Sequence, residues 1–132
     1  MEQPAPQQPT AIVLFAHGSR DPLWARTLDD LQAALQQQAA AQGRPLAVVQ
    51  AFLELMQPPL PQALHALAQQ GHRHVGLLPV FWAEGSHVRR DLPALVAQAQ
   101  QQHPGLQVQV WPVLSRWPGL LDWLAGQALA RP

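Results

Sequence analysis

The chain alternates four short apolar runs with four longer amphipathic stretches, and this alternation constrains its fold more than any other feature. The apolar runs are Ala11–Ala16, Leu46–Leu53, Val75–Phe81 and Leu106–Val110. Apolar runs of this length, without charged residues, are typical of strands covered on both faces. Strands separated by single helices predict a parallel sheet with right-handed crossovers and helices on both faces. We therefore expect an α/β fold: a single three-layer α/β/α domain with a four-stranded parallel sheet.

Capping and turn residues indicate where the predicted helices begin and end. Asp21 can cap the first helix and Pro22 can be its first residue, because proline at that position loses no hydrogen bond. The last apolar run alternates with polar residues, so Gln107 and Gln109 should face away from the core, as in an edge strand. The predicted helices run from Pro22 to about Ala41, from about Leu60 to Gly71, around Leu92–Ala99 and over Pro118–Ala130, with a loop at Trp82–His87.

Composition excludes several classes of function. Eight arginines balance eight acidic residues, so the chain has little charge with which to attract nucleic acid or an anionic membrane. No cysteine is present, and any metal must be held by histidine, carboxylate or backbone oxygen. Residues 1–10 are rich in proline and glutamine and lack the features of a signal peptide. We expect a disordered tail over 1–10, a domain over 11–132 and a cytoplasmic protein.

Two histidines follow predicted strands at one edge of the sheet. His17 comes directly after the first strand, and His87 lies in the loop after the third. Open parallel sheets bind ligands at the carboxyl ends of their strands, and we expect these two strands to be neighbours. A pair of imidazoles there suits Co²⁺, Ni²⁺, Fe²⁺ or Zn²⁺, and Glu84 could add a carboxylate as ligand or proton acceptor. The alternative is that each histidine caps a helix or bonds to a carbonyl group.

Several enzyme classes lack their motifs in this chain, and the arginines beside the two loops are candidate ligand-binding residues. Ala16 precedes the His-Gly pair where a histidine phosphatase has arginine, and the chain lacks a nucleophile elbow, a Walker motif and a dinucleotide-binding fingerprint. Arg20, Arg89 and Arg90 flank the two loops and could bind carboxylates of a polyanionic ligand, or pair with neighbouring aspartates.

The remaining histidines, His65, His72, His74 and His103, are interpreted as surface or structural residues. Three tryptophans, Trp111, Trp117 and Trp123, should fill the core or a subunit interface.

Three segments of the chain resemble signatures of the class II tetrapyrrole chelatases. They are Phe15–Pro22, Ala51–Pro58 and Leu78–Pro93, which occur in family order and at family spacing. The resemblance covers about Ala11–Pro112 and is closest to the short sirohydrochlorin cobaltochelatases, each of which is one half of the usual two-lobed enzyme. It implies a chelatase-like fold and the insertion of Co²⁺ or Fe²⁺, with Ni²⁺ as a further possibility, into sirohydrochlorin. The metal is then a substrate, and no permanent cofactor is expected.

The same resemblance implies roles for individual residues. His17 corresponds to the histidine that binds the metal and accepts a pyrrole proton, and His87 corresponds to the second metal ligand. A further substrate contact falls near Gln57, where related short chelatases carry a charged residue. Arg20, Arg89 and Arg90 would bind the carboxylates of sirohydrochlorin. The loop that contacts the macrocycle corresponds to Trp82, Ala83, Glu84, Gly85, Ser86 and His87.

The size of such a ligand predicts the assembly. A macrocycle about 10 Å across needs two walls to bury most of its surface, and one domain of this kind offers a single wall. We therefore expect a homodimer with its clefts between the subunits. Two other hypotheses stay open: a non-catalytic metal or tetrapyrrole carrier that uses the same histidines, and an interaction module whose histidines are structural.

Overall fold

The computed structural model describes residues 7–132, apart from the side chain of His87. The strands are β1 (Ala11–Ala16), β2 (Ala47–Phe52), β3 (His74–Pro79) and β4 (Gln107–Val110). The α-helices are α1 (Arg26–Ala41), α2 (Leu60–Gln69), α3 (Ser86–Gln102) and α4 (Leu120–Leu129). Two short 3₁₀ helices, η1 (Pro22–Ala25) and η2 (Leu114–Arg116), precede α1 and α4. The predicted alternation of strands and helices is confirmed.

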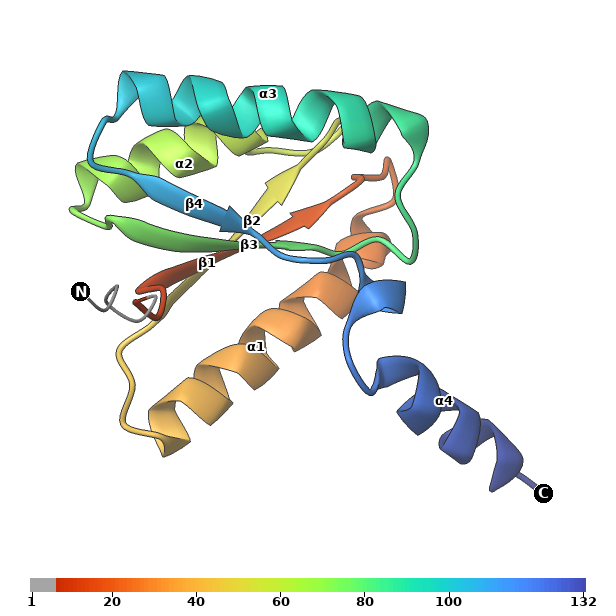
Figure 1. Cartoon of the computed structure of the whole chain (residues 1–132). Coiled ribbons are helices and arrows are strands. Elements are labelled where there is room, and N and C mark those ends of the chain that lie inside the picture. Colours follow the sequence, from red (N-terminus) through yellow and green to blue (C-terminus); the bar gives the residue numbers. More distant parts are fainter. Residues whose placement is uncertain (1–6) are drawn as a thin grey trace, which may run out of the picture.

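The strands form one parallel sheet in the order β2-β1-β3-β4 (Figure 1). β1 lies in the centre, with Val13 opposite Val49 of β2 and Leu77 of β3. α1 covers one face of the sheet, and α2 and α3 cover the other (Figure 1). The chain therefore leaves the neighbouring ends of β1 and β3 toward opposite faces, which creates the crevice where ligands of such sheets bind. The expected pairing of the first and third strands is confirmed.

β1 contributes to two hydrophobic cores, one on each face of the sheet. Val13 and Phe15 pack in the core beneath α2 and α3. Ile12 and Leu14 pack on the opposite face, against Leu28 of α1. All six residues of β1 are buried. This arrangement confirms the expectation that a continuous apolar run forms a strand covered on both sides.

β4 is an edge strand, as its alternating sequence predicts, and both Gln107 and Gln109 are exposed. Trp111 follows it and packs across Gly76 of β3, where a Cβ atom would collide with the indole ring. Trp117 contacts Trp111 edge to face, with ring centroids 6.0 Å apart. Both rings pack against the core on the α1 face. Both tryptophans are only partly buried, and their packing against the core fits the first alternative of the prediction, which named the core or a subunit interface.

Two helix starts differ from the sequence prediction. Asp21 does act as a cap, accepting a hydrogen bond from the Leu23 amide at 3.0 Å, but the turn that it caps is 3₁₀ and α1 begins only at Arg26. The predicted loop over Trp82–His87 is too long, because α3 already begins at Ser86. Residues at a helix start need no intrahelical partner for their amide groups, so Gly-Ser sequences that favour turns can also begin a helix.

The folded domain begins earlier in the chain than the sequence predicts. Residues 1–6 of the predicted tail lie outside the described residues. Thr10 extends the ladder of β1, donating to the carbonyl of His74 and accepting from the amide of Ala47, both at 3.0 Å. Arg44 donates to the carbonyl of Pro9 at 2.8 Å. The folded domain thus includes residues before position 11.

The last helix stands away from the rest of the molecule (Figure 1). α4 has no buried residue, and Leu121, Trp123, Leu124 and Leu129 are all exposed. Trp123 therefore does not fill the core of this chain, and its place in a subunit interface stays a prediction. Over residues 7–132, none of the helices combines the length and the apolar character needed to span a membrane.

Candidate metal and ligand site

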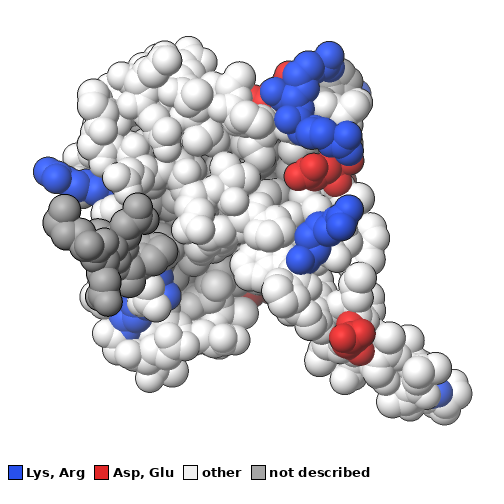
Figure 2. All heavy atoms as spheres, viewed as in Figure 1, with Lys and Arg blue, Asp and Glu red and all other residues white. Residues whose placement is uncertain are grey.

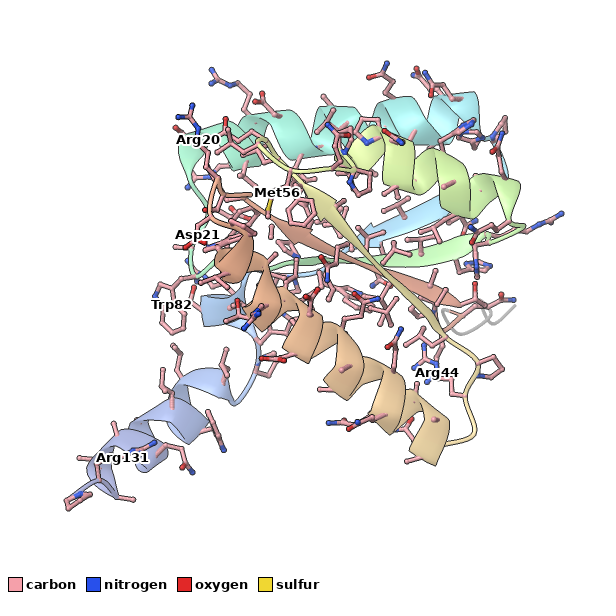
Figure 3. All side chains as sticks on the ribbon, turned by 180° about the vertical axis from the view of Figure 1, so that it is seen from behind. Arg20, Asp21, Arg44, Met56, Trp82 and Arg131 are labelled. Atoms are coloured by element: carbon pink, nitrogen blue, oxygen red, sulfur yellow. The ribbon has the colours of Figure 1, made fainter. Side chains whose placement is uncertain are left out.

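A cavity of about 680 Å³ opens at the carboxyl edge of the sheet. This is the edge where ligands of open parallel sheets bind. Figure 3 shows the labelled Arg20, Asp21, Met56 and Trp82 at this end of the molecule, with Arg44 at the opposite end. The residues that line the cavity come from the ends of β1 and β2, the segment after β3 and the start of α3: His17, Leu53, Glu54, Phe81, Ala83, Gly85, Ser86, Val88 and Asp91.

The side chains of His17 and Glu54, which both line the cavity, contact each other. Nε2 of His17 lies 2.9 Å from Oε1 of Glu54, and the two side chains are 55% and 56% exposed. When the carboxylate is ionised, it accepts a hydrogen bond from the Nε2–H group and leaves Nδ1 with a free lone pair. The carboxylate can accept the same hydrogen bond when both ring nitrogens carry a proton.

The backbone holds these two residues together. Beyond the end of the strand, the Glu54 amide donates to the His17 carbonyl at 3.0 Å, which continues the pairing of β1 with β2. Gly18 is buried with a φ of +100°, and a Cβ atom there would collide with the Glu54 carbonyl oxygen. Leu55 also has a positive φ, 68°, in the tight turn after Glu54. A glycine at position 18 is therefore what allows the two segments to approach so closely.

The separation of the two side-chain atoms suits a metal ion. With ligand bonds of about 2.1 Å, neighbouring ligands of an octahedral ion lie about 3.0 Å apart. The distance of 2.9 Å between Nε2 and Oε1 matches this spacing. Among the residues that the structure describes, no group of three or more histidines and carboxylates could hold a metal. A site with two protein ligands leaves several positions open on the ion, so the ion can be passed to another ligand.

His87 is the second residue of α3, between Ser86 and Val88, which both line the cavity. Its side chain lies outside the described residues, so its predicted role as the second metal ligand stays a prediction.

The structure places Glu84 differently from the predicted arrangement. Its carboxylate lies 3.6 Å from Nε of Arg89, and it lines two neighbouring hollows rather than the His17 cavity. The carboxylate that lies beside His17 belongs to Glu54. Sequence reasoning missed Glu54, although one signal was available: it is an acidic residue directly after a buried strand, at the same edge as His17.

The other predicted contact residues divide into two groups. Ala83, Gly85 and Ser86 line the cavity. Trp82 and Gln57 are exposed and do not belong to its lining. The cavity walls are therefore largely apolar, formed by Leu53, Phe81, Ala83 and Val88, with polar groups near the histidine and at the start of α3.

The three predicted arginines are exposed near the same end of the molecule. Figure 2 shows basic side chains gathered over the end where α3 begins, with carboxylates among them. Nε of Arg90 lies 3.7 Å from Oδ1 of Asp91, so one of the predicted arginine–aspartate pairs is present. Arg116, on η2, lines a hollow of about 440 Å³ together with Glu84 and Arg89. Arg116 is far from them in sequence, and nothing in its local sequence indicates this proximity.

Comparisons with known proteins found a matching family model and similar proteins. A family model described as CbiX matches residues 11–129. The sirohydrochlorin cobaltochelatase of Methanocaldococcus jannaschii is 31% identical over 93 residues, which are 70% of this chain and 62% of that protein. The protein of the same name from Methanothermobacter thermautotrophicus is 30% identical over 97 residues, 73% of this chain and 64% of that protein. The chain thus spans less than two thirds of the length of these curated relatives.

Two solved structures share the fold. A putative cobalamin (vitamin B12) biosynthesis CbiX protein from Marinobacter aquaeolei VT8 superposes with a TM-score of 0.72 at 26% identity, covering 92% of this chain and 98% of that one. The sirohydrochlorin chelatase SirB from Bacillus subtilis subspecies spizizenii, in complex with cobalt, gives a TM-score of 0.61 at 25% identity. That match covers 80% of this chain and 44% of the SirB chain.

Proposed function

This chain belongs to the CbiX family, and from that premise we propose that it is a chelatase that inserts a divalent metal ion into sirohydrochlorin. The observation that carries the proposal is the contact of His17 Nε2 with Glu54 Oε1, 2.9 Å long, in a cavity with largely apolar walls. Co²⁺ is the proposed metal substrate, and Fe²⁺ and Ni²⁺ are the alternatives that the experiment below compares.

The cavity suits a flat ring with acidic substituents. Its volume of about 680 Å³ falls within the range of about 300–1,000 Å³ that is usual for small-molecule sites. Leu53, Phe81 and Val88 can contact the apolar face of a macrocycle. Arg89 and Arg90 lie close to the start of α3, where guanidinium groups can bind the carboxylates at the edge of the ring.

The chemistry follows from charge balance. Two pyrrole N–H protons must leave the ring as one M²⁺ ion enters it. The lone pair of His17 Nε2 cannot bind the metal and a proton at the same moment, so we infer an order of events. His17 and Glu54, whose Nε2 and Oε1 atoms lie 2.9 Å apart, would hold the ion first, with the imidazole proton on Nδ1, and ring nitrogens would then replace these ligands. The released imidazole accepts one pyrrole proton at Nε2, the neighbouring carboxylate accepts the hydrogen bond from this N–H group, and the second pyrrole proton passes to water.

The assembly follows from the open shape of the site. One domain provides a single wall for the ring, and it covers less than half of the matched SirB chain. We propose that a second copy supplies the other wall, in a homodimer. The exposed apolar residues of α4, including Leu121, Trp123 and Leu124, are the proposed contact surface. The chain has a formal net charge of zero, so two copies can approach without net repulsion.

The test is an anaerobic insertion assay with sirohydrochlorin and, in parallel, Co²⁺, Fe²⁺ or Ni²⁺, followed by the change in the absorption spectrum. His17→Ala should reduce the rate to that of the uncatalysed reaction. His72→Ala serves as a control, because His72 bonds to Thr10 and does not line the cavity. Multiple turnovers per protomer would exclude a carrier, whereas tight binding without turnover would favour it. Full activity of His17→Ala would refute the proposed site.

A further inference from the structure

Four histidines lie outside the candidate site, and two of them meet. His65 is on α2, and His103 is the residue that follows α3. Nδ1 of His65 lies 3.0 Å from Nε2 of His103, with ring centroids 4.9 Å apart and ring planes inclined by 50°. The two residues are 38 positions apart in sequence, so only the packing of α2 against α3 brings them together. Their positions in the sequence predict only surface or structural roles for both.

The backbone of His103 is held on both sides. Its amide donates to the carbonyl of Ala99 at 2.9 Å, and its carbonyl accepts from the amide of Leu106 at 2.8 Å. His65 lies within the regular helix α2, whose buried residues Leu64 and Leu67 fix its orientation against the core. The two imidazoles are therefore presented by well-anchored backbone segments, and the rings need only small rotations to adjust their spacing.

The distance between the two nitrogens is close to that of two ligands on one metal ion. With metal–nitrogen bonds of about 2.0–2.1 Å, neighbouring ligands lie about 3.0 Å apart in square or octahedral geometry and about 3.4 Å apart in a tetrahedron. The observed 3.0 Å matches the spacing in square or octahedral geometry, so the rings must turn for both lone pairs to point at one ion but need not move apart. One imidazole proton now lies between the nitrogens in a hydrogen bond, and a metal ion would replace that proton.

The surroundings allow an ion to enter. His65 is exposed and His103 is half-buried, so the remaining coordination positions are open to water. In the part of the chain that the structure describes, no third histidine or carboxylate completes the pair. Two imidazole ligands favour late first-row ions, with affinity rising from Co²⁺ through Ni²⁺ to Cu²⁺.

From this geometry we propose that His65 and His103 form a second, two-histidine site for a divalent transition-metal ion. It is separate from the His17 cavity and connects α2 with the end of α3. The inference does not depend on the proposed chelatase activity, because it requires only metal and protein. Bound metal should also raise the melting temperature, since it binds the native arrangement of the two helices and not the unfolded chain.

The experiment uses the full chain without an affinity tag. In a His17→Ala/His87→Ala background, which removes the predicted ligands of the first site, Ni²⁺ is titrated by calorimetry and Cu²⁺ by electron paramagnetic resonance. We expect about one equivalent of Cu²⁺ with nitrogen hyperfine coupling. Adding His65→Ala or His103→Ala should weaken binding at least tenfold and abolish the metal-dependent rise in melting temperature.

Matched controls keep the outcome interpretable. His72→Ala and His74→Ala in the same background should retain the full affinity for Ni²⁺ and Cu²⁺. Circular dichroism of each metal-free variant shows whether it is folded, and His65→Gln provides a second variant if His65→Ala is not. Unchanged binding after loss of His65 and of His103, or no binding in the His17→Ala/His87→Ala background, would overturn the proposal. Neither result would bear on metal insertion, which the spectral assay measures independently.

Discussion

Glu54 holds the ring of His17 at a distance that suits both a hydrogen bond and a shared metal ion. Replacing Glu54 by glutamine keeps the side-chain volume and one acceptor oxygen but removes the negative charge. We expect Glu54→Gln to slow metal insertion about 100-fold or more, the usual scale for losing a group that assists proton transfer. The melting temperature should hardly change, because both side chains are more than half exposed and exposed ion pairs contribute little to stability.

The measurement is the steady-state rate of anaerobic insertion, combined with a thermal melt. Asp30→Asn is the matched control, because Asp30 is an exposed carboxylate on α1 and its removal should leave the rate unchanged. An unchanged rate in Glu54→Gln would exclude Glu54 from the mechanism. A large fall in melting temperature would instead indicate a structural role.

Gly18 makes a different contribution, since it permits the close approach of the two segments. Gly18→Ala introduces strain at a φ of +100° and a collision with the Glu54 carbonyl. We expect the free energy of unfolding, measured by urea denaturation, to fall by about 1–3 kcal/mol and the insertion rate to fall as well. Gly71→Ala separates the two effects, because Gly71 has a φ of +92° but open space around its Cβ position. Equal losses in the two variants would show that the collision is unimportant.

At this scale the sequence predicted His17 but not its partner. His17 stands out because it ends a run of six apolar residues. Glu54 is flanked by Leu53 and Leu55, and only the pairing of β1 with β2 places it beside the histidine. Glu84 was predicted to join the site because it lies in the same short segment as His87. Its side chain lies beside Arg89, one turn into α3, which no local pattern indicates.

The elements themselves were predicted more completely, because their signals are local. A run of apolar residues without a charge requires burial on both sides, and β1 has the predicted bounds, Ala11–Ala16. The alternating pattern of β4 predicts an exposed edge, which the structure shows. The start of α3 was predicted too late because glycine and serine indicate a turn and a helix start equally well.

The packing of β3 against the segment after β4 gives a test at the scale of elements. Gly76→Ala would drive a methyl group into the indole of Trp111, so the ring must move and separate from Trp117. We expect a loss of about 1–3 kcal/mol in the free energy of unfolding, the usual cost of overpacking, together with a change in tryptophan fluorescence. Gly105→Ala, whose Cβ would meet no atom within 4 Å, should change stability by less than about 0.5 kcal/mol. Equal stability of the two variants would contradict this packing.

At the scale of the whole molecule, packing within a single chain leaves the apolar residues of α4 exposed. The sequence predicts a helix over Pro118–Ala130, in which Trp123 should fill the core or a subunit interface. The structure confirms the helix, yet none of its residues is buried and the helix extends away from the sheet (Figure 1). Local patterns specify that a surface is apolar but not which surface covers it, so the partner of α4 could not be derived from the sequence.

The proposed homodimer makes this surface testable. Trp123→Glu combined with Leu124→Glu places two charges where the second copy is expected to bind, and burying unpaired charges is costly. We expect sedimentation velocity at micromolar concentration to show a dimer for the unmodified chain and a monomer for the variant. The variant should remain folded by circular dichroism, because α4 contributes nothing to the core. Its insertion rate per protomer should fall, since each site then has only one wall.

Gln37→Glu, an exposed change on α1, should leave both the assembly and the rate unaltered. A monomeric, fully active unmodified chain would show that one domain is sufficient to enclose the ring.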